Sequence, residues 1–182
     1  MKILKPSAQV FEQASIDEAY LDVTEYVENN WDSALALCRK LQENIKQVIG
    51  LSASFGIASN RILAKMASEV NKPNGIFRIL PDELADFFEG RNIREVPGIG
   101  KKRATQLQEW GITTIDEMYT YGEISLARIT GERFAAWITR VYEGRTSSEI
   151  SPLRSRKSIG KEHTFDYDRE NYRVVLENLL SI

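Results

Sequence analysis

Two kinds of apolar pattern alternate over the first 80 residues, and this alternation limits the folds that the chain can adopt. Short segments place apolar residues at every second position, as strands do, and longer segments place them every three or four positions, as helices do. The predicted strands are residues 10–17, 19–24, 51–58 and 76–80, and the predicted helices are residues 31–49 and 60–70. This order predicts an α+β fold, in which a small mixed or antiparallel sheet carries helices on one face.

Individual residues within these predicted strands and helices make the fold prediction more specific. Glu12 falls on the apolar face of the first strand, among residues expected to be buried. In the third strand, Gly56 belongs to a face of small residues, which would let a helix, another backbone or a ligand come close. Gly50 predicts the end of the first helix. The apolar stripe of that helix is expected to consist of Trp31, Leu35, Cys38, Leu41, Ile45 and Val48.

From Pro81 onward the pattern changes to short helices only. Thr114 and Glu117 have the spacing of a capping box, which predicts the start of one of them. A polar linker is expected over residues 145–155, then a strand over 157–165 and a helix over 168–182. The predicted parts of the chain are therefore 1–80, 81–150 and 151–182. The helices expected in the second part are 82–88, 100–109, 114–120 and 132–142.

Composition excludes several classes of protein. The 182 residues carry a formal net charge of −2, so the chain is not uniformly basic, although basic patches can still bind nucleic acid. No run of about 18 apolar residues predicts a membrane span, and the start does not read as a secretory signal. Cys38 is the one cysteine, which excludes an intramolecular disulfide and a cysteine-rich zinc site. A cytoplasmic protein is the default expectation.

Adjacent carboxylates at the junction of the first two strands form the first candidate site. Asp17 and Glu18 would be held by the strand ends, and Mg²⁺ prefers carboxylate oxygens. The alternative is a pair of solvated acids in a turn, which is common on protein surfaces.

A glycine turn forms the second candidate. Gly98, Ile99 and Gly100 allow a tight hairpin with outward N–H groups, before a helix that starts with Lys101, Lys102 and Arg103. Such a turn favours an anion such as a DNA phosphate. The alternative is an ordinary corner between two helices.

Other basic residues are weaker candidates. Lys65 and Lys72 could meet a polyphosphate near the sheet or could be solvated. Arg154 and Arg156 would share one face of a strand and, with Lys157 and Lys161, could grip a nucleic-acid backbone, or could belong to a solvated linker. His163, the one histidine, has no convincing nucleophile near it, so hydrolase triads receive no support.

Five blocks together resemble the Y-family of translesion DNA polymerases, of the DNA polymerase IV type. The resemblance covers essentially the whole chain, and the blocks follow the order and spacing of the family. They are residues 15–22 (SIDEAYLD), 59–68 (SNRILAKMAS), 71–75 (NKPNG), 96–100 (VPGIG) and 156–160 (RKSIG).

The resemblance implies a role for each part. Residues 1–80 would be the C-terminal part of the palm, 81–150 the helix-hairpin-helix thumb, and 151–182 the linker and first strand and helix of the little finger. Asp17 and Glu18 match two metal-binding carboxylates, Lys72 matches a triphosphate-contacting lysine, and Ser15 flanks the metal site. The complete enzyme would bind two Mg²⁺ ions, primer-template DNA, damaged DNA included, and deoxynucleoside triphosphates. A sliding clamp is a candidate partner of the full-length protein.

The family's first metal-binding aspartate and its fingers have no counterpart in this sequence. Asp166, Tyr167 and Asp168 resemble that first motif but follow the thumb, so they are not counted. Arg61 and Glu69 stand where the family often has Lys and Asp. The resemblance therefore predicts an internal fragment that does not polymerise alone. The alternatives are a non-catalytic helix-hairpin-helix DNA-repair module and, more weakly, a palm like that of nucleotidyl cyclases.

Overall fold

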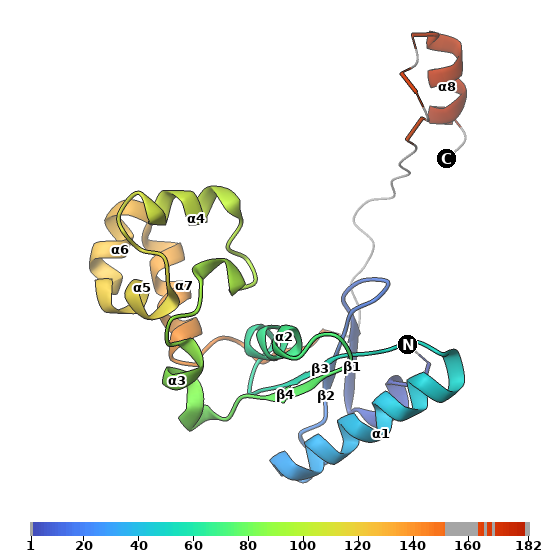
Figure 1. Cartoon of the computed structure of the whole chain (residues 1–182), viewed down its shortest axis with the longest axis horizontal. Helices are drawn as coiled ribbons and strands as arrows, with labels where there is room; N and C mark the ends of the chain where they lie inside the picture. Colours follow the sequence, from blue (N-terminus) through green and yellow to red (C-terminus); the bar gives the residue numbers. More distant parts are fainter. Residues whose placement is uncertain (1, 152–163, 166, 169, 181–182) are drawn as a thin grey trace. The chain divides into compact units, whose positions relative to one another are not determined.

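The structure is a computed structural model that describes residues 2–151, 164–165, 167–168 and 170–180. The chain forms two compact units, Met1–Pro152 and Leu153–Ile182 (Figure 1). Arg154, Arg156, Lys157, Lys161 and His163 lie outside the described residues, so their predicted roles stay predictions. Among the described residues, no helix has the length and apolar character needed to cross a membrane.

The first two strands form an antiparallel hairpin. β1 (Val10–Gln13) pairs with β2 (Ala19–Asp22), with Glu12 opposite Tyr20. Both strands are shorter than predicted: β1 ends early because the chain turns after Gln13, and β2 ends at Asp22, the residue that pairs with the first residue of β1. The Ala14 N–H donates to the carbonyl of Glu18 over 3.0 Å, which places the two acidic residues in the turn, as expected. A short 3-10 helix, η1 (Lys5–Ser7), precedes the hairpin.

The long helix has the predicted bounds. α1 (Trp31–Ile49) begins after Asn30, whose side chain accepts two N–H groups of the first turn, and ends at Gly50, which is left-handed with φ +71°. The predicted stripe is wrong in the last turn, because Val48 is 68% exposed. No described segment covers that turn, so only the earlier part of the stripe contributes to the core.

A second pair of strands is parallel. β3 (Phe55–Ile57) and β4 (Ile76–Arg78) are joined through α2 (Arg61–Val70). The strand predicted over residues 51–58 is much shorter, because β4 offers only three residues for pairing. The α+β class is confirmed, but the strands form two separate two-stranded sheets, one antiparallel and one parallel, rather than the single small sheet predicted.

The two long helices of this part cover opposite faces of the β3–β4 pair, not one face as predicted (Figure 1). Ile57 packs with Ala34 of α1, whereas a Cβ on the neighbouring Gly56 would lie 2.0 Å from the Ala64 carbonyl of α2. Successive residues of a strand point to opposite faces, so the helices must lie on opposite sides. The predicted face of small residues therefore receives the backbone of α2.

Short helices follow, as predicted for this region. The sequence pattern missed α6, which buries only Leu126 and so shows a weak apolar stripe. One core runs from α2 through these helices, with Phe88, Ile115 and Val141 fully enclosed. The division at residue 80 stays a prediction. The elements are η2 (Pro81–Glu83), α3 (Leu84–Phe88), η3 (Ile93–Glu95), α4 (Lys101–Gln108), α5 (Ile115–Tyr121), α6 (Glu123–Thr130) and α7 (Glu132–Tyr142).

The second unit contains α8 (Tyr172–Leu180), which lies within the helix predicted over residues 168–182. Most of the strand predicted over 157–165 lies outside the described residues.

Candidate metal and nucleic-acid sites

Ser15 organises the turn that carries the two acidic residues. Its hydroxyl donates to Asp17 Oδ1 over 2.6 Å and accepts the backbone N–H of Glu18 over 3.0 Å. The hydrogen bond from Ser15 lowers the pKa of the Asp17 carboxyl. The backbone N–H of Asp17 and the charges of Lys65 and Lys72 lower this pKa further. Asp17 is exposed and is therefore ionised at neutral pH.

Charged residues of α2 and of the segment directly after it lie near this turn. Lys65 Nζ contacts Glu18 Oε1 and lies 2.9 Å from Glu69 Oε1, and Lys72 Nζ lies 2.8 Å from the same Glu69 oxygen. Burial would lower the pKa of Lys65, but its hydrogen bonds to Glu18 and Glu69 outweigh burial and raise it. Both lysines lower the pKa of Glu69, with Lys72 the stronger. The cluster therefore holds fixed charges of both signs.

A cavity of about 770 Å³ opens beside these residues. β2, β3 and α1 line its apolar part, and Asp17, Glu18, Lys65, Ser68 and Lys72 line its polar part. Two carboxylates and two ammonium groups on one cavity wall suit a ligand that joins a divalent cation to phosphate groups.

The described residues contain no group of three or more His, Cys, Asp or Glu side chains that could hold a metal ion. Asp17 and Glu18 still fit Mg²⁺, because this ion is usually bound through one or two carboxylates together with substrate phosphates. Remaining ligands would have to come from solvent, substrate or other protein groups.

The glycine turn has the predicted hairpin shape. Gly98 has φ +102°, which side chains rarely allow, and Ile99 is buried and donates its N–H to the Val96 carbonyl over 3.0 Å. α4 starts after Gly100 with no side-chain cap. The positive end of its dipole is therefore open to an anion, as the sequence indicated.

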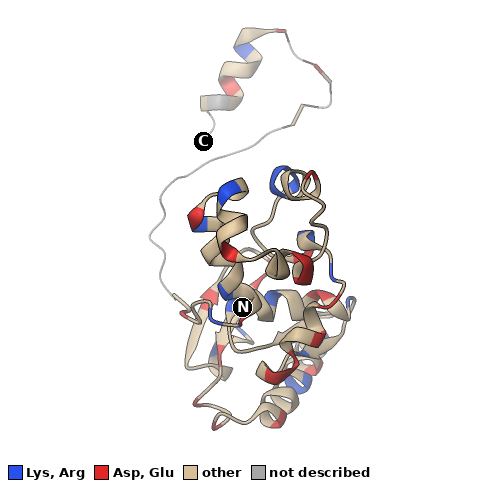
Figure 2. Cartoon of the chain, turned by 90° about the vertical axis from the view of Figure 1, so that its left-hand side faces the viewer, with Lys and Arg blue, Asp and Glu red and all other residues tan. Residues whose placement is uncertain are grey.

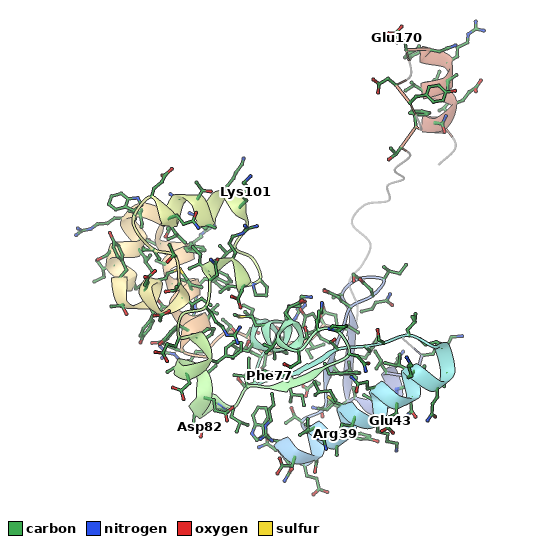
Figure 3. The ribbon with its side chains drawn as sticks, in the orientation of Figure 1. Arg39, Glu43, Phe77, Asp82, Lys101 and Glu170 are labelled. Carbon is green, nitrogen blue, oxygen red and sulfur yellow. The ribbon has the colours of Figure 1, made fainter. Side chains whose placement is uncertain are left out.

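The three basic residues after the turn are not equivalent. Lys101 and Lys102 are exposed, and Figure 3 shows Lys101 at the start of α4 with its side chain directed away from the helix. The Arg103 guanidinium instead donates to Gln106 and to the Thr130 carbonyl, and lies 4.6 Å above the ring of Phe134. Figure 2 shows that acidic and basic residues are interspersed along the ribbon.

Sequence reasoning considered Lys65 but did not assign Glu69 to the site. The spacing of Lys65 and Glu69 on α2 is the available signal, because residues four apart share a helix face. The contact of Lys65 with the turn at Glu18 is long-range and has no local signature in the sequence.

Comparisons with known proteins agree with this geometry. Residues 1–69 match the impB/mucB/samB family, and residues 81–112 match the IMS family HHH motif. DNA polymerase IV of Saccharolobus solfataricus is 35% identical over 179 residues, which are 98% of this chain and 50% of the relative. DNA polymerase IV of Shewanella frigidimarina is 39% identical over 157 residues, which are 86% of this chain and 43% of the relative. Nearly the whole chain is similar to Y-family DNA polymerases.

Solved structures of the family share the fold. A Y-family DNA polymerase chimera built from Dbh and Dpo4 has a TM-score of 0.87 and 36% identity, and the match covers 100% of this chain and 52% of the chimera. An insertion ternary complex of Dbh DNA polymerase has a TM-score of 0.76 and 37% identity, covering 82% of this chain and 44% of that one. The chain spans about half the length of the curated relatives it matches.

Proposed function

We propose that this chain supplies part of a template-directed DNA polymerase for translesion synthesis, in which Asp17 and Glu18 bind Mg²⁺. Similarity to DNA polymerase IV and to Y-family polymerase structures supports the reaction class, and the site supports the roles of the residues. The observation that supports the proposal most strongly is that one cavity is lined by Asp17, Glu18, Lys65 and Lys72. A helix-hairpin-helix module without catalysis explains the glycine turn but leaves this cluster unused, so it is not favoured.

Each residue of the cluster has a distinct task. Asp17 and Glu18 would offer oxygen ligands, and Ser15 would keep Asp17 oriented and ionised through its 2.6 Å hydrogen bond. Lys65 and Lys72 would neutralise triphosphate oxygens. When bound, Mg²⁺ would promote attack of the primer 3′-hydroxyl and stabilise the charge that develops on the phosphates.

Binding of triphosphate requires the lysines to change partners. Lys65 and Lys72 both contact Glu69, and Lys65 also contacts Glu18. A triphosphate would compete with these carboxylates for the ammonium groups, while the metal would compete with Lys65 for Glu18.

The glycine turn would hold the DNA backbone. N–H groups at the start of α4 and the cations of Lys101 and Lys102 suit a phosphate, and such contacts carry no sequence information. The DNA-binding roles of Arg154, Arg156 and Lys157 remain part of the proposal from sequence.

Titration of the purified chain with dATP and Mg²⁺, followed by calorimetry, tests the nucleotide site. We expect measurable binding that Asp17→Asn and Glu18→Gln each weaken by about tenfold, because each removes one charged ligand. Glu43→Gln is the matched control, since Glu43 lies on the outer face of α1 and the change in charge is the same (Figure 3). Equal affinities in all four proteins would contradict the proposal.

Primer extension tests the catalytic half of the proposal. The described residues provide two carboxylates but no group of three, so we expect the chain alone not to extend a primer with Mg²⁺ and four deoxynucleotides. Extension by the purified chain would show that the predicted dependence on a further carboxylate is wrong.

A further inference from the structure

Glu12 is a charged residue in the interior of the first compact unit. Its side chain is only 2% exposed, although an ionised carboxylate is costly to bury without partners. Glu12 Oε1 lies 3.0 Å from the Arg61 guanidinium, and Glu12 Oε2 accepts the backbone N–H of Ser151 over 2.9 Å. Three segments far apart in the sequence therefore meet at one carboxylate.

Arg61 is also held from a second side. Its guanidinium lies 4.5 Å above the ring of Tyr20, the residue opposite Glu12 in the β1–β2 hairpin. A carboxylate on one strand and an aromatic ring on the other thus fix the first residue of α2 against the hairpin.

The same face of α2 carries the lysine of the candidate site. Lys65 follows Arg61 by four residues, so the two side chains lie one turn apart on one face. Arg61 contacts Glu12 within the hairpin, and Lys65 contacts Glu18 at its turn. The two cations are similarly exposed, but Glu12 is 2% exposed and Glu18 is 43% exposed, so the first contact is better protected from water and salt.

The residues that leave α7 are held at two points. Asn60 Nδ2, at the N-cap of α2, donates to the Gly144 carbonyl over 3.2 Å, and Glu12 Oε2 of β1 accepts the Ser151 N–H. One end of the segment from Gly144 to Ser151 is therefore bound to the start of α2, and the other end is bound to the carboxylate that contacts Arg61.

We propose that Glu12 is a positioning residue, whose carboxylate sets α2 on the β1–β2 hairpin so that Lys65 faces Glu18, and fixes Ser151 at the same place. A carboxylate suits both tasks in this geometry, because each of its oxygens accepts one of the two donors. A glutamine in the same place would turn its NH₂ group, which is a donor, toward Arg61 or toward Ser151 and so would weaken at least one of the two contacts.

Zero-length cross-linking with a carbodiimide measures the position of Lys65. The reagent joins an ammonium group to a carboxylate in contact, and mass spectrometry quantifies the Lys65–Glu18 product. The Lys72–Glu69 product is an internal control, because that contact lies within α2 and the residues directly after it. Amide exchange at Ser151, followed by NMR, measures the second task.

Glu12→Ala is expected to lower the Lys65–Glu18 product several-fold relative to Lys72–Glu69 and to speed exchange at Ser151 by about tenfold or more, the equivalent of one lost hydrogen bond. Glu12→Gln should lower the Lys65–Glu18 product, speed exchange at Ser151, or do both. If Glu12→Ala does not fold, the result for Glu12→Gln tests the proposal. Arg61→Lys, which keeps the cation, should retain more of the cross-link than Arg61→Met. Glu43→Ala is the matched surface control.

Unchanged cross-linking and exchange in both Glu12 variants would overturn the proposal, as would equal cross-linking in Arg61→Lys and Arg61→Met. Both readouts are taken without nucleotide, metal or DNA. The outcome is therefore independent of the polymerase function proposed above.

Discussion

Lys65 contacts Glu18, so a carboxylate proposed to bind metal is already paired with a cation of α2. The metal ion and Lys65 therefore compete for the same oxygen. Lys65→Met should raise the affinity of the chain for Mn²⁺ about threefold or more, because it removes a positive charge from the site. Calorimetric titration with Mn²⁺ measures this effect.

The same substitution should act in the opposite direction on nucleotide binding. Lys65→Met removes a cation that would contact the triphosphate, so the affinity for dATP with Mg²⁺ should fall. Lys40→Met on the exposed side of α1 is the matched control. If Lys65→Met changed both affinities in the same direction, Lys65 would not have the role proposed here.

Gly56 allows α2 to lie directly on β3. A Cβ at this position would lie 2.0 Å from the Ala64 carbonyl and 2.4 Å from the Ser68 nitrogen, and both are backbone atoms that cannot move aside alone. Gly56→Ala should lower the free energy of unfolding by about 3 kcal/mol or more, as overpacking against backbone does. Urea denaturation followed by circular dichroism measures the change.

Gly100→Ala is the control for this prediction. A Cβ at Gly100 meets nothing within 4 Å, and its φ is −80°, which any residue can adopt. Its free energy of unfolding should change far less than that of Gly56→Ala. Equal losses in the two variants would contradict the close packing of α2 on β3.

Acid sensitivity of the helical region should depend on Glu117. Its carboxylate accepts the backbone and side-chain donors of Thr113 and the backbone N–H of Thr114, and these bonds lower its pKa from 4.5 to about 2. A lowered pKa in the folded chain means that its contribution is complete above about pH 4.5 and is lost as the pH falls toward 2.

Glu117→Gln should therefore lower the Tm at pH 7 by a few degrees, and the difference from the parent chain should shrink as the pH falls through this window. Scanning calorimetry at several pH values measures it. Glu43→Gln should show no such pH-dependent difference. A constant difference down to pH 2 would exclude the charge of Glu117 as its cause.

Substitutions of the three basic residues after the glycine turn should have different effects on DNA binding. Lys101→Ala and Lys102→Ala should each weaken binding and reduce the slope of log K against log salt by about one, the effect of one lost phosphate contact. Arg103→Ala should mainly lower the Tm, because its guanidinium is engaged by Gln106, Thr130 and Phe134. Fluorescence anisotropy with a primer-template duplex at several salt concentrations measures the slopes. Identical slopes in both lysine variants and the parent chain would remove the turn from the DNA interface.

Local patterns predicted the elements that have strong local signals. The bounds of α1 were predicted from a periodic apolar stripe and Gly50, and the start of α5 was predicted from Thr114 and Glu117. α6 was missed because it buries one side chain only. The positions of Asp17 and Glu18 in a turn were predictable because the two predicted strands meet at these residues.

Long-range relationships were not predictable in the same way. The placement of α1 and α2 on opposite faces depends on which helix packs against each face of β3. The alternation of residues within a strand does not identify that helix. Glu12 on an apolar face was a visible signal of a buried charge pair. Its partners Arg61 and Ser151 lie 49 and 139 residues away, so only the folded chain identifies them.

Binding of Mn²⁺ to the chain, followed by the loss of the free-ion signal in electron paramagnetic resonance, tests the central claim most directly. The account predicts binding by the parent chain and by the double variant Glu25→Gln/Glu43→Gln, and loss of that binding in Asp17→Asn/Glu18→Gln. Equal binding by the parent chain and Asp17→Asn/Glu18→Gln would contradict the claim that these two carboxylates form the metal site.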